Sequence, residues 1–395
     1  GGNEFTVRVL QVFLALISCN LVFFSIRPYS WKLAGVAALA MAIHPWAARL
    51  VGSLLSETLG LFLCAVLVYT MSRIKQGSRK PLILFIFGFA LIVLPLNSPA
   101  TIILSIALGG YVFAGLLRER NLRATIIAMA GVLVVLTPWQ VHCVKATGSV
   151  CVTLYSENVI TRTSNSNGGN PLYYWFRTWA HGERDLFVIW HGTIAETPGR
   201  AFYSAQDQSS LAETIPEPLR ALDDEHLGLL GKVGQDFVEN NRLKFYLILP
   251  AIRSFTLWFD MRQIDHLQME YVGRFSPAAI ANDWREGGVE RALARLIKAL
   301  VSTVVYVIYI VYPVFLVLML GYGVVRRQMI VILICGSVLA YTFVSGYIAH
   351  GESRRNVVFL PAILYLLRFV PSGKIDQTKR LLRDSPDVVG KVHKP

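Results

Sequence analysis

The sequence predicts an all-α polytopic membrane protein, with about nine transmembrane helices and a mixed α/β extracytoplasmic segment. The chain of 395 residues is 54% hydrophobic and 16% charged, and its mean hydropathy is +0.49. A soluble domain cannot bury so much apolar surface. Apolar runs long enough to cross a bilayer recur along the chain, and one long polar stretch interrupts them.

Nine apolar segments are candidates for membrane spans, six before the polar stretch and three after it. Their expected limits are 7–26, 33–48, 51–71, 82–97, 99–117, 124–142, 298–323, 329–349 and 356–370. The second, fourth and ninth are short for a helix that needs about 20 residues to cross.

These segments divide the chain into four parts. Transmembrane helices occupy 1–142 and 298–371, an extracytoplasmic domain occupies 143–297, and a basic cytoplasmic tail occupies 372–395. The chain begins with Gly1, and no charged region precedes the first apolar run. We therefore expect a fragment or a processed product rather than a chain with a signal peptide.

Orientation follows from the loops that are rich in lysine and arginine. Three such loops, at 72–80, 118–123 and 326–327, fall on the same side as the tail when nine spans alternate. The positive-inside rule makes that side the cytoplasm. These loops also account for much of the net charge of +13. Nucleic-acid binding is excluded, because no basic stripe interleaved with aromatic residues occurs.

The polar stretch begins with a β-prone run that becomes rich in Ser, Asn and Gly, which indicates a strand followed by a loop. Apolar residues at helical spacing over 217–247 indicate amphipathic helices against the membrane face or the domain. The acidic cluster 223–226 is a solvated helix face or a divalent-metal site. Cys143 and Cys151, eight residues apart, could form a disulfide in an oxidising compartment, and they have no metal-ligand spacing.

Four ionisable residues, His350, Glu352, Arg354 and Arg355, separate the last two apolar segments. They lie at the outer face in this topology, where the positive-inside rule disfavours arginine. Either the arginines simply snorkel to the interface, or they bind an anionic group. The guanidinium fork suits phosphate.

Glu57 is the acidic residue well inside a predicted span, near His44 and Arg49 at its outer end. A carboxylate at that depth is costly unless it faces protein or a wet cavity, so it is a functional candidate. The alternative is a structural glutamate that pairs with Arg49 or a neighbouring helix. His142 and Lys145 follow the sixth span at the same outer level.

Three stretches together resemble the GT-C superfamily of polyprenyl-phosphate-sugar-dependent glycosyltransferases, which includes protein O-mannosyltransferase-like and aminoarabinose-transferase-like families. They are "AMAIHPWAARLVGSLLSETLGLFLCAVLVY", "VVLTPWQVHCVKATGSVCVTLYSENVITRTSNSNGGNP" and "HGESRRNVVFLP". Glu57 matches the family's intramembrane acid, Arg354 the arginine of its late motif, and Asn170 the asparagine of its "GN". The resemblance covers about 100 residues directly.

The resemblance implies transfer of a sugar from a polyprenyl-phosphate donor to a protein, lipid or glycan acceptor on the outer face of a bacterial inner membrane. The donor and the membrane lipids are the implied partners. Cations would stabilise the departing phosphate. The candidates for that task, with supporting residues, are Arg354, His350, Arg355, His142, Lys145, Glu352, His44, Arg49 and Asn170.

The sequence departs from the family pattern at several positions. His142 stands where the family usually has arginine, and Arg355 where it has an aromatic residue. The principal catalytic aspartate of the family should lie before Gly1. We therefore assign no catalytic base and treat Glu57 as a secondary acid. A polysaccharide polymerase, a ligase, a lipid-linked glycan flippase and an inactive scaffold derived from the transferase remain alternatives.

Overall fold

The structure is a computed structural model that describes residues 3–44, 56–147, 171–181, 185, 188–189, 192–202, 204–259, 277–348 and 358–370. Within these ranges the chain is helical and contains no strand. The prediction of a membrane protein built from α-helices is thus confirmed for the described part. The strand expected in the polar stretch falls in 148–170, outside the described residues, and the described part of that stretch is helical rather than mixed α/β.

Each predicted span overlaps an apolar helix or the apolar part of a longer one. These helices are α1 (Asn3–Ile26), α2 (Trp31–Ala42), α4 (Ser56–Lys75), α5 (Pro81–Asn97), α6 (Ile102–Arg118), α7 (Leu122–Thr147), α15 (Pro277–Val325), α16 (Met329–Ile348) and α17 (Leu360–Tyr365).

Four apolar stretches in the described residues are long enough to cross a membrane by length and composition. They are Glu4–Ile26, Glu57–Lys75, Pro99–Arg118 and Leu122–Lys145. The apolar parts of α2, α5, α15, α16 and α17 are shorter. That all nine helices cross the bilayer therefore stays a prediction.

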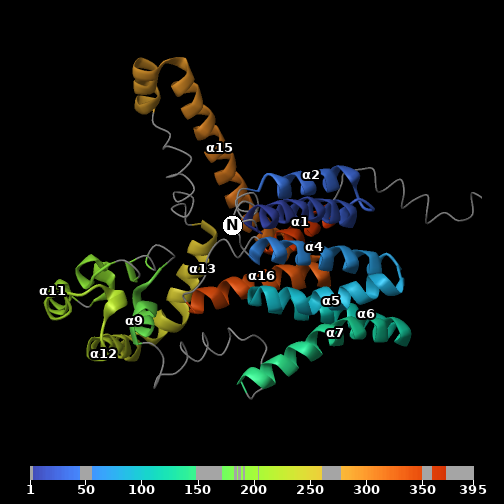
Figure 1. The fold of residues 1–395 in the computed structure, drawn as a ribbon, viewed down its shortest axis with the longest axis horizontal. Helices are drawn as coiled ribbons and strands as arrows, with labels where there is room; N and C mark the ends of the chain where they lie inside the picture. The colour runs from blue at the N-terminus through green and yellow to red at the C-terminus, as the bar shows by residue number, and fades with distance from the viewer. Residues whose placement is uncertain are drawn as a thin grey trace, which may run out of the picture.

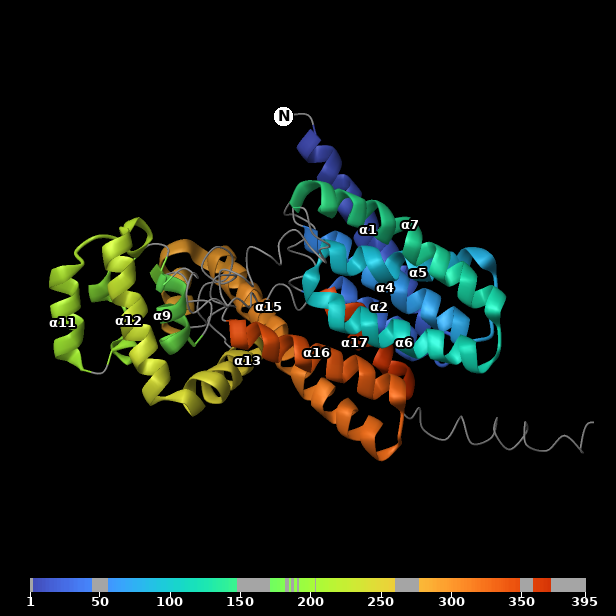
Figure 2. The same ribbon diagram turned by 90° about the horizontal axis from the view of Figure 1, so that it is seen from below.

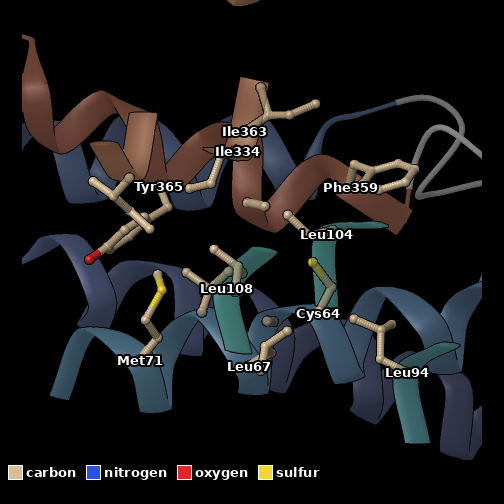
Figure 3. Close-up of a cluster of buried hydrophobic side chains, with 14 of the residues drawn as sticks. Cys64, Leu67, Met71, Leu94, Leu104, Leu108, Ile334, Phe359, Ile363 and Tyr365 are labelled. Carbon is tan, nitrogen blue, oxygen red and sulfur yellow. The ribbon is translucent and has the colours of Figure 1, made fainter. Parts of the chain in front are cut away.

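Helix α4 lies at the centre of the bundle, in contact with α1, α5, α6 and α17. Two thirds of its most apolar window is buried inside the protein, against 28% for α1 and 22% for α7, so α1 and α7 present much more surface outward. Figure 3 shows the core around α4. Its labelled side chains are Cys64, Leu67, Met71, Leu94, Leu104, Leu108, Ile334, Phe359, Ile363 and Tyr365.

Glycines bring α5 and α7 into backbone contact. A Cβ added at Gly88 of α5 would lie 1.9 Å from the Ala128 carbonyl oxygen, and one at Gly131 of α7 would lie 2.2 Å from the Phe85 carbonyl oxygen. Small residues that let backbones approach are the usual means of packing helices in membranes, where lipid offers no hydrophobic driving force between them.

The last helix is buried on all sides. Every residue from Leu360 to Leu366 is buried, and α17 packs against α4, α1 and α2. With the 3₁₀ turn η7 (Leu366–Phe369) it makes an apolar stretch of only Leu360–Phe369. At about 1.5–2 Å per residue this is shorter than the bilayer core of about 30 Å.

A separate helical domain occupies the described residues between 171 and 259. It contains α9 (Pro171–Trp179), α11 (Ala205–Thr214), α12 (Asp224–Asn240), a π-helical turn η5 (Lys244–Ile248) and α13 (Leu249–Phe259), with short 3₁₀ turns η2 (Ile194–Glu196), η3 (Gly199–Ala201) and η4 (Leu219–Ala221). Its own core forms around Trp175, Phe176 and Trp179. Figures 1 and 2 show this domain beyond one end of the bundle, with α13 leading back to α16.

The acidic cluster 223–226 forms the start of α12. Asp223 is the N-cap residue, and its side chain accepts the His226 backbone N–H at 2.9 Å. Asp224 and Glu225 occupy the first turn, where negative charge is favoured by the helix dipole. The cluster therefore has a structural role as a helix start.

Candidate functional site

The bundle has two chemically different ends. At one end, which we call the basic end, Arg79 before α5 pairs with Glu119 after α6. The Ser72 hydroxyl in α4 donates to the Ser25 carbonyl of α1 at 3.0 Å. Figure 2 shows the turn between α15 and α16 at this end too, away from the helical domain. The basic residues at the basic end are Arg27, Lys32, Arg73, Lys75, Arg79, Lys80, Arg118, Arg120, Arg123, Arg326, Arg327 and Arg368.

The opposite end, which we call the domain end, adjoins the helical domain. Helix α2 starts at the basic end and runs away from it, so His44 beyond its C-terminus lies at the domain end. Helix α4 finishes at the basic end, which places Glu57, in its first turn, at the domain end as well. Helix direction thus brings these two predicted residues to one level of the bundle.

Glu57 is buried, with 9% of its surface exposed. Gly60, one turn further along α4, marks where two other segments approach. A Cβ added there would lie 3.1 Å from Asn97 Nδ2, at the end of α5, and 3.2 Å from Val358 Cγ1. Val358 directly follows the stretch "HGESRRNV". The residues near Glu57 therefore include Val358, the first described residue of the late motif.

His44 forms a second polar feature at the domain end, with Tyr312 of α15. The two rings meet edge to face, with centroids 5.3 Å apart and planes at 82°. His44 is 7% exposed, and neither its Nδ1 atom nor the Tyr312 hydroxyl, both buried, has a hydrogen-bond partner among the described residues. A buried polar atom without a partner costs about 1–3 kcal/mol. Sequence reasoning missed Tyr312, although a phenol hydroxyl inside an apolar run was a usable signal.

His142 and Lys145 lie at the same end of the bundle, near the C-terminus of α7, and both are exposed. The His142 ring lies 6.1 Å from the ring of Trp139, on the same helix. Cys143, the residue after His142, is buried and disulfide-bonded. Cys151, its expected partner, lies outside the described residues, whereas Cys19, Cys64 and Cys335 are free.

Several predicted site residues lie outside the described residues. They are Arg49, Asn170, His350, Glu352, Arg354 and Arg355. In the part of the chain that the structure describes, no group of three or more His, Cys, Asp or Glu side chains could hold a metal ion.

Arg253 of α13 ties this helix to the end of α9, and sequence reasoning did not identify it. We call the region where α9, α13 and α16 meet the joint. It is 4% exposed, its Nε donates to the Ala180 carbonyl at 2.7 Å, and an Nη donates to the Arg177 carbonyl. These carbonyls lie at the C-terminal end of α9, where a cation complements the helix dipole. Burial lowers the pKa of Arg253 to about 9, which leaves it charged at neutral pH. One residue on, the Ser254 hydroxyl donates to the Thr342 carbonyl of α16 at 3.2 Å.

His181 lies in the same joint. Its backbone N–H donates to Asp185 Oδ2 at 2.6 Å, and its carbonyl accepts the Thr256 hydroxyl at 2.6 Å. Burial lowers the pKa of His181 below its ordinary 6.5, and the charge of Arg200 lowers it further.

This pKa predicts acid sensitivity of the joint. The unfolded chain binds a proton at His181 more readily than the folded one, so stability is full above about pH 6.5 and falls as the pH drops below it. Thermal unfolding of the helical domain, followed by the fluorescence of buried Trp175 and Trp179, should shift to lower temperature at pH 5.5 than at pH 7.5. His181→Gln should reduce that shift, and an unchanged shift would contradict the assignment.

Among known proteins, no family model, no curated protein and no solved structure matches this chain.

Proposed function

We propose that the protein is a membrane glycosyltransferase. It moves a sugar from a polyprenyl-phosphate donor to an acceptor at the domain end of the bundle. The observation that carries this proposal is the approach of Val358 to Gly60, one turn from Glu57. Val358 is four residues after Arg354 in the sequence, a separation that a chain spans in at most about 14 Å. In the proposed site Glu57 acts together with Arg354.

The chemistry of such a region suits a lipid-linked donor. The isoprenoid tail needs lipid, and the outward faces of helices such as α1 and α7 are apolar. The phosphate leaves the anomeric carbon with growing negative charge, so a fixed arginine lowers the barrier. Glu57, buried at the domain end, orients a hydroxyl group of the donor or the acceptor, and the helical domain at the same end contacts the acceptor.

The test of this function is donor turnover by the full-length protein in proteoliposomes that contain a polyprenyl-phosphate sugar. Arg354→Ala should lower turnover about 10- to 100-fold, the value of one charge-assisted hydrogen bond. Glu57→Gln should lower it as well. The control Arg326→Ala removes an exposed arginine at the basic end and should keep turnover near that of the unsubstituted protein. If Arg354→Ala and Glu57→Gln both turn over donor at the unsubstituted rate, the site is wrong.

Tyr312 allows a separate test that distinguishes function from structure. Because its buried hydroxyl has no partner, Tyr312→Phe should leave the melting temperature unchanged or slightly raised. If the His44–Tyr312 pair contacts donor or acceptor, the same substitution should lower turnover several-fold. A variant with unchanged turnover and raised stability would show that the hydroxyl has no role in the reaction.

A further inference from the structure

The segment from Leu243 to Phe255, which comprises η5 and most of α13, has one buried face and one exposed face. The buried face consists of Phe245, Leu249, Pro250 and Arg253. The exposed face is apolar: Leu243 is 67% exposed, Leu247 53% and Phe255 63%. Tyr246, Ile248 and Ala251 extend it. We call this exposed face the α13 stripe.

The α13 stripe has the exposure of a lipid-facing surface. On α1, which is long and apolar enough to cross a membrane, Leu10 is 56% exposed and Phe13 58%. A contiguous apolar surface of this kind marks an interaction site when it lies on a folded protein. The stripe belongs, however, to a segment that the sequence assigns to the extracytoplasmic domain.

The depth of the stripe in the bundle follows from the packing of α13 on α16. Ser254, beside Phe255, donates to the Thr342 carbonyl. Thr342 is three residues from the end of the apolar stretch Met329–Ser345 of α16, which is about 4–5 Å along the helix. The Phe255 end of the stripe therefore lies close to the end of the apolar stretch of α16.

The charges along the segment also suit a position at the membrane interface. No aspartate or glutamate occurs from 241 to 259, and Arg242 and Lys244, both exposed, stand at its beginning. The third cation, Arg253, is buried and bonded to the end of α9. A helix with an apolar face, basic residues beside it and no acid is the kind that lies in the membrane interface.

We propose that the α13 stripe is immersed in the lipid bilayer as an interfacial helix, with Arg242 and Lys244 at the phosphate level. The helical domain then rests on lipid as well as on α16. The five-residue π-helical turn places three consecutive apolar side chains, Tyr246 to Ile248, on the exposed face. This surface is independent of any catalytic activity, and the partner that it binds is phospholipid.

The test is spin-label accessibility in nanodiscs of phosphatidylcholine with a minority of phosphatidylglycerol. Leu247→Cys and Phe255→Cys are labelled separately in a Cys19→Ser background, since Cys64 and Cys335 are buried. Both labels should collide more with oxygen, which partitions into lipid, than with a water-soluble nickel chelate. Asp236→Cys, on the exposed side of α12, is the matched control and should show the reverse.

Two results would overturn the proposal. Nickel collisions at both sites equal to those of the Asp236→Cys control would mean that the stripe faces water. Low collisions with both reagents, with dipolar broadening that disappears when labelled protein is diluted with unlabelled protein, would mean that a second copy covers it. The use of two sites guards against a single variant that does not fold.

Discussion

Gly131→Ala is expected to destabilise the bundle by about 3 kcal/mol, at the upper end of the cost of overpacking. The new Cβ would lie 2.2 Å from the Phe85 carbonyl oxygen and 2.8 Å from the Phe89 backbone nitrogen. Both are backbone atoms, so no rotamer change relieves the clash and α7 must move away from α5. The melting temperature in detergent micelles measures the loss.

Gly110→Ala is the matched control for this substitution. Gly110 is also in a membrane helix, α6, but it is exposed and a Cβ there meets no atom within 4 Å. It should melt at the same temperature as the unsubstituted protein or slightly above it. A double variant with Gly88→Ala should lose less than the sum of the single losses, because one separation of α5 from α7 relieves both clashes. Equal melting of Gly131→Ala and Gly110→Ala would contradict the packing.

Arg253→Met should loosen the joint by freeing α13 from the end of α9. The substitution keeps an unbranched apolar stem but removes two hydrogen bonds from a charged donor, each worth about 1.5–3 kcal/mol. It also leaves the Ala180 and Arg177 carbonyls buried at the end of α9 with one donor fewer. We expect a loss of about 3 kcal/mol that is confined to this joint.

Hydrogen–deuterium exchange can localise the effect of Arg253→Met. Amides of α9 and α13 should exchange faster in the variant, and those of α5 and α7 should not change. Arg242→Met serves as the control, because Arg242 is exposed and lies at the start of the same segment. Faster exchange throughout the bundle, or equal effects of the two variants, would show that Arg253 does not hold the joint.

Hydropathy was sufficient to predict the helical bundle, because each expected span coincides with an apolar helix. It could not predict which helices face lipid. Helix α17 is as apolar as its neighbours, yet it is buried all round. The mean hydropathy of a segment reflects the free-energy cost of exposing its side chains to water. Lipid and protein avoid that cost equally well, because either can shield the side chains from water. For the same reason the α13 stripe could not be identified as a membrane surface from its letters alone.

The site could be predicted in part. Glu57 and His44 were identifiable because ionisable residues in apolar segments are rare and expensive. The approach of Val358 to Gly60 depends on how helices distant in sequence pack, which no local pattern encodes. Arg253 was missed because its two acceptors are backbone carbonyls, and every residue type supplies those. A sequence can indicate a carboxylate as a partner, but it cannot indicate which carbonyl lacks a donor.

The burial of α17 also sets an order of events during synthesis. Arg368, just after α17, donates to the Tyr29 hydroxyl at 3.0 Å, across 339 residues of chain. At about 5–20 residues per second, roughly 17–70 s separate the synthesis of the two partners. During this interval the surfaces of α1, α2 and α4 that α17 later covers have no protein partner. These surfaces are apolar, so lipid can cover them until α17 arrives and displaces it.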